Sequence, residues 1–212
     1  MEKIMSESQW VEKIKDLLYS RHLGSEIEVR TKARLPYAGE FMEYDIDLQP
    51  SKANQSTTAF ETDLLVCERT GDIIKPRVVI EAKFGGVTTH DAIIYSYKAQ
   101  RHKAVTPYLR YGIMLGNMKE EALPWRLFRH GAYFDFMIRF SDAVLTMNEK
   151  DTFVDLIKSE MAYSRQWENM ILDSRKKSRT YFFCMQNKPH FKEMKKNRPL
   201  AASGRRNTSL PE

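Results

Sequence analysis

The chain has 212 residues, of which 42% are hydrophobic and 29% are charged, and its formal net charge is +6. This composition is typical of a soluble globular protein with one domain, and its two cysteines accompany no Cys/His cluster of zinc spacing. No apolar run is long enough to span a membrane, and the first residues mix charge into apolar positions, so we expect no membrane span, no signal peptide and a cytoplasmic location.

Hydrophobic periodicity predicts a helix, several strands, a second helix and a further strand, followed by additional elements. The first helix carries Trp10, Ile14, Leu17 and Leu18 at helical spacing, and Gly24 is its expected end. The expected elements are a helix at 7–21, strands at 26–31 and 40–48, a polar loop at 49–58, strands at 59–68 and 77–84, a helix at 89–105, strands at 109–116 and 132–140, and a helix at 149–177.

Two of the predicted strands concentrate their charges on one face. Glu61 and Asp63 share a face of the strand that begins at residue 59, and Glu81 and Lys83 share a face of the next strand. Because successive side chains of a strand point to opposite faces, each strand has a second face that is wholly apolar. These four charges are therefore expected on one side of a sheet.

A turn-favouring pair, Gly71 and Asp72, separates these strands and predicts a hairpin. Residues whose numbers sum to 144 then lie opposite each other, so Asp63 faces Glu81. Like charges directly across a ladder are destabilising, and a divalent cation between them would remove the conflict. The alternative is a cross-strand salt bridge, such as Asp63 with Lys83.

Hard carboxylate oxygens of this kind suit Mg²⁺, with Mn²⁺ as a substitute. Such an ion lowers the pKa of a bound water and neutralises charge on a phosphodiester. Lys83 would position or deprotonate that water, or stabilise the phosphate, and Glu61 would lie at the periphery. His90 and His102 have no partner at metal-ligand spacing, so we expect both at the surface or as helix caps.

These residues resemble the motif of the PD-(D/E)XK nuclease superfamily, the restriction-endonuclease-like fold. The resemblance rests on "ETD" (61–63), seventeen intervening residues and "EAK" (81–83), within an order of helices and strands that covers residues 7–116. Thr62 stands where the family name has proline. The resemblance implies an α/β fold with an αβββαβ core, in which helices flank a central mixed sheet, and Mg²⁺-dependent hydrolysis of phosphodiester bonds.

Matched by position, the resemblance makes Asp63 and Glu81 the metal ligands and Lys83 the catalytic lysine. The family often takes a further acid from the first helix, and we assign Glu12 to that role, with an ordinary solvated helix face as the alternative. Gln100, on the helix after the motif, would approach the site or a DNA phosphate.

Positive charge is concentrated in residues 165–212, which hold twelve Lys/Arg and four Asp/Glu, a net charge of +8 that leaves −2 for residues 1–164. Lysines and arginines release counterions from a polyanion, and the interleaved aromatic residues can stack on bases, so this segment predicts nucleic-acid binding. The alternative is a solvated helix end followed by a tail. The basic residues that we assign to nucleic-acid binding are Lys98, Arg101, Lys103, Arg175, Lys176, Lys177 and Arg179.

We therefore expect a nuclease core at 1–145, a C-terminal helix at 146–180 packed on or extending from it, and a basic, partly disordered tail at 181–212. The predicted function is a metal-dependent DNA endonuclease; the same chemistry on RNA or branched DNA stays open, as does a homodimer. The alternative from another class is a non-catalytic nucleic-acid-binding or scaffolding protein with the same fold. The lysine of the motif favours the enzyme, because a scaffold has no chemical need for it.

Overall fold

The structure is a computed structural model that describes residues 5–41, 45–47, 49, 55–118 and 122–174. In chain order its elements are α1 (Glu7–Ser20), β1 (Ile27–Phe41), β2 (Gln55–Thr70), β3 (Ile73–Phe84), α2 (Thr89–Val105), β4 (Arg110–Gly116), α3 (Trp125–His130), β5 (Phe136–Arg139) and α4 (Met147–Ser174). All of them belong to one compact unit, Met1–Lys177. Among the helices of these described ranges, none has the length and apolarity that crossing a membrane requires.

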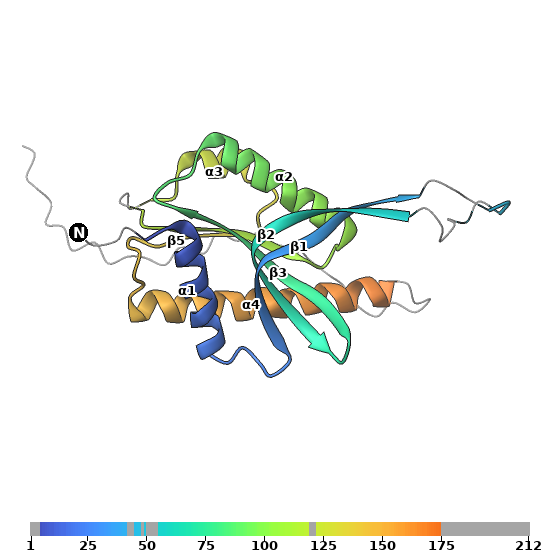
Figure 1. The fold of residues 1–212 in the computed structure, drawn as a ribbon, viewed down its shortest axis with the longest axis horizontal. Helices are drawn as coiled ribbons and strands as arrows, with labels where there is room; N and C mark the ends of the chain where they lie inside the picture. Colours follow the sequence, from blue (N-terminus) through green and yellow to red (C-terminus); the bar gives the residue numbers. More distant parts are fainter. Residues whose placement is uncertain (1–4, 42–44, 48, 50–54, 119–121, 175–212) are drawn as a thin grey trace, which may run out of the picture. The chain divides into compact units, whose positions relative to one another are not determined.

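The five strands form one mixed sheet in the order β1-β2-β3-β4-β5 (Figure 1). β2 pairs antiparallel with both β1 and β3, whereas β4 runs parallel to both β3 and β5. α2 connects β3 to β4, because two parallel strands must be joined by a crossover, which is usually a helix. The prediction of an α/β fold with helices around a mixed central sheet is therefore confirmed.

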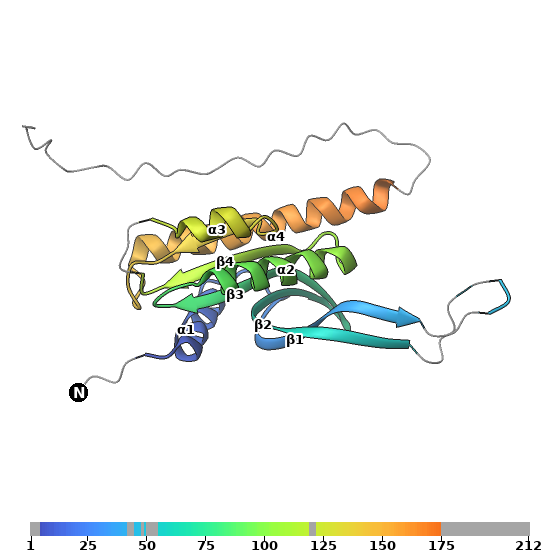
Figure 2. The same ribbon diagram turned by 90° about the horizontal axis from the view of Figure 1, so that it is seen from above.

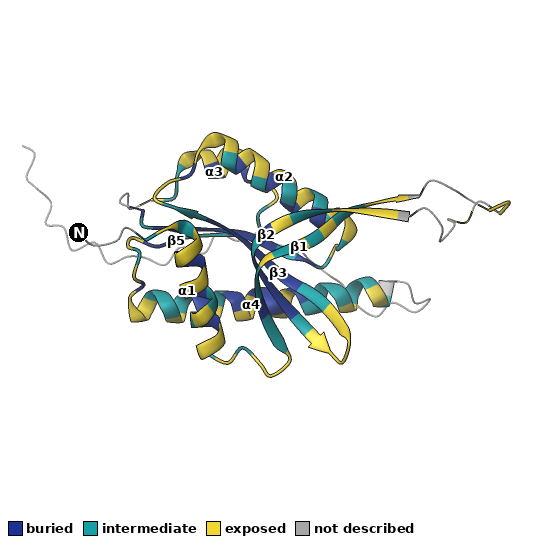
Figure 3. Cartoon of the chain, viewed as in Figure 1, coloured by how far each residue is buried: buried dark blue, intermediate teal, exposed yellow. Residues whose placement is uncertain are grey.

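Helices cover both faces of the sheet, and the strand alternation predicted from the sequence decides which side chains meet them (Figures 2 and 3). On one face, Leu64 and Ile80 join a core with Trp10 of α1 and Phe153 of α4. On the other face, Val79 packs in a cluster with side chains of α2 and β4, and a neighbouring cluster includes α3. The face that carries Glu81 is therefore the face beneath α2.

β1 and β2 outrun the rest of the sheet and continue together as a two-stranded ribbon (Figures 1 and 2). Their pairing extends to Phe41 opposite Gln55, whereas the pairing of β2 with β3 stops at Leu64. The predicted strand at 40–48 is wrong, since β1 ends at Phe41 and residues 45–47 lie outside any strand. The predicted loop at 49–58 is wrong where β2 begins. Residues 39–40 and 56–58 of the ribbon are exposed, so this part of the sequence lacks the apolar alternation of a half-buried strand.

Helix starts are marked by reciprocal hydrogen bonds between a capping hydroxyl and a side chain three residues later. Ser6 and Gln9 make them at α1, and Thr88 and Asp91 at α2. Thr146 and Glu149 make the same pair of contacts, so α4 begins at Met147, slightly before the predicted start. The predicted strand at 132–140 is shorter than expected, and the predicted tail at 181–212 lies outside the described residues.

We expect Gly116→Ala to destabilise the protein, because a Cβ at Gly116 would lie 2.4 Å from Cζ2 of Trp10, which is fully buried. Overpacking of this kind costs about 1–3 kcal/mol. Gly39→Ala is the matched strand control, since a Cβ there meets no heavy atom of the described residues within 4 Å. Urea denaturation of both variants measures the difference, and equal stabilities would contradict the packing of α1 on β4.

Candidate active site

The hairpin of β2 and β3 forms as predicted, with Gly71 at the turn in the left-handed region (φ 59°). The predicted register, in which residue numbers sum to 144, holds from Leu64, opposite Ile80, to Val66. A bulge between Val66 and Cys67 shifts the pairs nearer the turn by one residue. Asp63 is the first residue of β2 beyond this ladder.

After Ile80, β3 has no paired residues of β2 beside it, and carboxylate oxygens accept hydrogen bonds from its backbone instead. The backbone N–H of Ala82 donates to Oδ2 of Asp63 at 2.8 Å, and that of Phe84 donates to Oε2 of Glu7 at 3.1 Å. Alternate N–H groups of a strand point to the same edge, so these two donors would otherwise face an absent strand. The separation of β2 from β3 thus fixes two acids beside the motif strand.

β1 is irregular at the same level. Lys32 has a φ of 52°, a left-handed conformation that is uncommon for a residue with a side chain. It lies between the ladder partners of Leu64 and Thr62, and therefore opposite Asp63. Such backbone strain costs on the order of 1–3 kcal/mol and clusters at functional sites.

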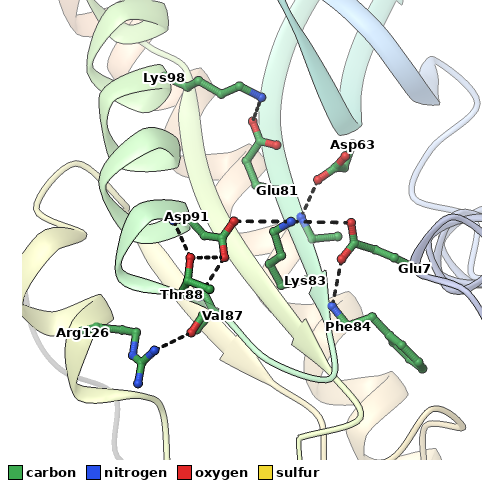
Figure 4. Close-up of polar contacts among 11 residues, drawn as sticks. Glu7, Asp63, Glu81, Lys83, Phe84, Val87, Thr88, Asp91, Lys98 and Arg126 are labelled. Atoms are coloured by element: carbon green, nitrogen blue, oxygen red, sulfur yellow. Dashed lines mark hydrogen bonds and ion pairs between the residues drawn. The ribbon is translucent and has the colours of Figure 1, made fainter.

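Glu81 is the most buried acid of this group, with only 1% of the residue exposed. Its Oε1 accepts a hydrogen bond from Nζ of Lys98 at 3.2 Å (Figure 4). The same oxygen also accepts a hydrogen bond from the Tyr111 hydroxyl. Its Oε2 is buried and has no hydrogen-bond partner among the described residues. Burial raises the pKa of Glu81 to about 7; Lys98 opposes this shift, and the negative charge of Asp63 adds to it.

Lys83 lies two residues further along β3, and its ammonium is paired with two carboxylates (Figure 4). Nζ is 3.5 Å from Oδ1 of Asp91 and 3.9 Å from Oε1 of Glu7. Burial lowers the pKa of Lys83, but the Tyr95 hydroxyl and the two carboxylates outweigh it, so the pKa is raised. Lys83 is therefore a stable cation rather than a base, and no ion pair joins it to Asp63 in the described part of the chain.

Polar groups of α2 face β3; among them Asp91 and Tyr95 were not predicted to lie at the site, and Lys98 was predicted to bind nucleic acid. Asp91, Tyr95, Lys98 and His102 recur at intervals of four, three and four, which places them on one face of the helix. Asp91 forms an ion pair with Lys83, whose ammonium also lies over the Tyr95 ring, and Lys98 forms an ion pair with Glu81. Their helical spacing was the one sequence signal that they share a face of α2. The same spacing also fits an ordinary amphipathic helix, so it did not identify a site.

On this face of α2, Tyr95 and His102 both lie in buried surroundings. Burial and the charges of Asp63 and Glu81 together raise the pKa of Tyr95 to about 12 against the opposing effect of Lys83, so the hydroxyl stays protonated near both acids. His102 is fully buried, with Nε2 3.0 Å from the carbonyl oxygen of Leu35, so its expected surface position is wrong.

The remaining predicted residues are not gathered at the site. Glu12 accepts a hydrogen bond from Thr31 and pairs with Lys15, so the α1 acid beside β3 is Glu7 instead. The other predicted residues of α2 also have partners elsewhere: Gln100 donates a hydrogen bond to Tyr133, Lys103 pairs with Asp135 at 2.7 Å, and Arg101 lies over the Tyr37 ring. Glu61 is exposed and contacts Lys98 through its backbone carbonyl. The basic residues Arg175, Lys176, Lys177 and Arg179 lie outside the described residues.

The donor set is compatible with a cation held by Asp63 and Glu81. No group of three or more His, Cys, Asp or Glu side chains in the described ranges is arranged to hold a metal ion. Mg²⁺, however, commonly uses one or two carboxylates and keeps several waters. The unpartnered, buried Oε2 of Glu81 is the observation that fits such an ion, because a buried carboxylate oxygen without a partner is destabilising.

No protein-family model matches the chain, and no curated protein matches it either.

We expect Glu81 to lower the stability of the metal-free protein progressively as pH rises from 4.5 to 7. The pKa of Glu81 is raised from its ordinary value of 4.5 to about 7, so the folded state binds the proton more tightly than the unfolded state in this window. Glu81→Gln should remove roughly 3 kcal/mol of this pH dependence. Urea denaturation of both proteins in a chelator at several pH values measures it, and parallel profiles would contradict the buried environment of Glu81.

Proposed function

We propose that the chain is a metal-dependent nuclease of the PD-(D/E)XK superfamily that hydrolyses phosphodiester bonds, with DNA as its substrate. The observation that carries the proposal is the buried Glu81 carboxylate, which has one oxygen without a partner among the described residues and lies close enough to Asp63 for that charge to raise its pKa. The element order of α1, three antiparallel strands, α2 and a parallel strand also supports it.

In this proposal Asp63 and Glu81 hold the ion, since each retains a carboxylate oxygen that accepts no hydrogen bond from the described residues. A bound Mg²⁺ would supply an acidified water and charge neutralisation at the phosphate. Lys83, with its raised pKa, stabilises negative charge that develops on the phosphate. Tyr95, whose ring centroid lies 5.4 Å from Nζ of Lys83, orients that ammonium.

The alternative is a nucleic-acid-binding protein that keeps this fold without turnover. The pairing of Lys83 with Asp91 and Glu7 favours it, because both partners satisfy the lysine within the protein. All three side chains are partly exposed, however, and ion pairs of that kind are weak. A phosphate at the site can therefore compete for Lys83.

Lys83→Ala tests the proposal directly. With Mg²⁺ or Mn²⁺, cleavage of duplex, single-stranded or branched DNA, or of RNA, should fall on the order of 10²-fold or more, because transition-state stabilisation is removed. Folding and nucleic-acid affinity should be retained. Lys75→Ala is the matched control, because it removes another ion-paired lysine of β3, one whose partner is Glu168. Absence of metal-dependent cleavage by the wild type on all of these substrates would favour the non-catalytic alternative.

Deletion of residues 175–212 tests the basic segment, which contributes eleven of the twelve Lys/Arg in residues 165–212. For duplex DNA, every phosphate that the shortened chain no longer binds should flatten the dependence of log affinity on log salt by about 0.9. We expect weaker binding with a shallower salt slope, and metal-dependent cleavage that persists at low salt. An unchanged slope would show that this segment binds no phosphates.

A further inference from the structure

The ammonium of Lys98 is enclosed by protein groups. Nζ lies 3.2 Å from Oε1 of Glu81 and donates to the backbone carbonyl of Glu61 at 2.8 Å. The rings of Phe60 and Tyr95 lie 5.8 and 5.2 Å from it, and only 17% of the side chain is exposed. The donors of this ammonium are therefore already directed at two oxygen atoms of the protein.

Lys98 bridges the two strands that carry the acids. Glu81 belongs to β3, and Glu61 stands on β2 two residues before Asp63. The ladder between β2 and β3 ends at Leu64, so the two strands are no longer paired through their backbones at this level. The single ammonium from α2 therefore connects them where the ladder hydrogen bonds stop.

The two oxygens of the Glu81 carboxylate have different environments. Oε1 receives both the Tyr111 hydroxyl and the Lys98 ammonium, whereas Oε2 has no partner in the described part of the chain. Figure 4 shows the second oxygen on the side of Asp63. With Oε1 held by two donors, the carboxylate presents Oε2 toward the other acid.

We propose that Lys98 is a positioning residue that holds Glu81 and the β2 backbone for cation binding, and that it does not bind nucleic-acid phosphate. This inference rests on the proposed function in taking Asp63 and Glu81 as the cation ligands. Groups that hydrogen-bond to a ligating carboxylate restrict its orientation and strengthen metal binding. The charge of Lys98 alone would have the opposite effect on metal affinity, because a nearby ammonium repels a divalent cation. The direction of the change in metal affinity therefore separates the two effects.

The test is Mn²⁺ binding to Lys98→Met, measured by titration calorimetry without nucleic acid. Removal of a partner from a ligating carboxylate weakens metal affinity by roughly 10–100-fold, and we expect a decrease in that range. Lys98→Arg, which keeps the charge and donors, should recover part of it. Lys103→Met is the matched control, because it removes another partly buried, carboxylate-paired lysine of α2 and should leave Mn²⁺ affinity unchanged.

Unchanged or tighter Mn²⁺ binding by Lys98→Met would overturn the inference, and so would an equal decrease in Lys103→Met. If Lys98→Met does not fold, Lys98→Arg carries the test. A folded arginine variant that retains part or all of the wild-type Mn²⁺ affinity supports the positioning role, and a folded arginine variant without Mn²⁺ affinity contradicts it. Wild-type protein that binds no Mn²⁺ would overturn both this inference and the proposed cation site.

A second measurement addresses phosphate binding by Lys98. In chelator, the dependence of log DNA affinity on log salt should be the same for Lys98→Met and the wild type, whereas a lysine that binds phosphate would flatten it by about 0.9 when removed. Wild-type protein whose Mn²⁺ affinity depends on Lys98 but that cleaves none of the substrates would leave the inference standing and overturn the nuclease. Wild-type cleavage with unchanged Mn²⁺ affinity in Lys98→Met would do the reverse.

Discussion

The site depends on the point at which β2 leaves β3. The N–H groups of a β-strand must find hydrogen-bond acceptors, and after Ile80 of β3 the neighbouring strand β2 no longer supplies them. Asp63 and Glu7 supply carboxylate oxygens to the N–H groups of Ala82 and Phe84. Negative charge is therefore gathered at this edge by backbone hydrogen bonding, before any cation is considered. The charge of Asp63 then acts on the buried Glu81 beside it.

The opposite face of the same strands offsets the instability of this arrangement. Leu64, Ile80 and Ala82 pack into a fully buried core with Trp10, and such burial contributes roughly 1.5–3 kcal/mol for each large side chain. A buried acid with one unpaired oxygen opposes folding by an amount of similar size. One strand thus carries both a stabilising apolar face and a destabilising polar face, as its period of two permits.

The sequence allowed the local features of the site to be predicted, because strand alternation and turn chemistry act over a few residues. The shared face of Glu81 and Lys83, the hairpin at Gly71 and the register at Leu64 all follow from them. The choice between Glu7 and Glu12 depends instead on how α1 is seated on the sheet, which is set by tertiary packing such as Trp10 on Gly116. Local periodicity contains no information about that packing.

The instability that Glu81 introduces bears differently on cation binding and on turnover. A scaffold would fold as well with an apolar residue or an amide there, since a buried carboxylate is stabilising only when its oxygens are satisfied. The Oε2 atom, which has no partner among the described residues, therefore argues for a cation. The proposed turnover would use Lys83 as well, and that ammonium is held by Asp91 and Glu7 at 3.5 and 3.9 Å. Those distances exceed a normal hydrogen bond, so the pairs hold Lys83 near the acids while leaving its donors able to turn to a phosphate.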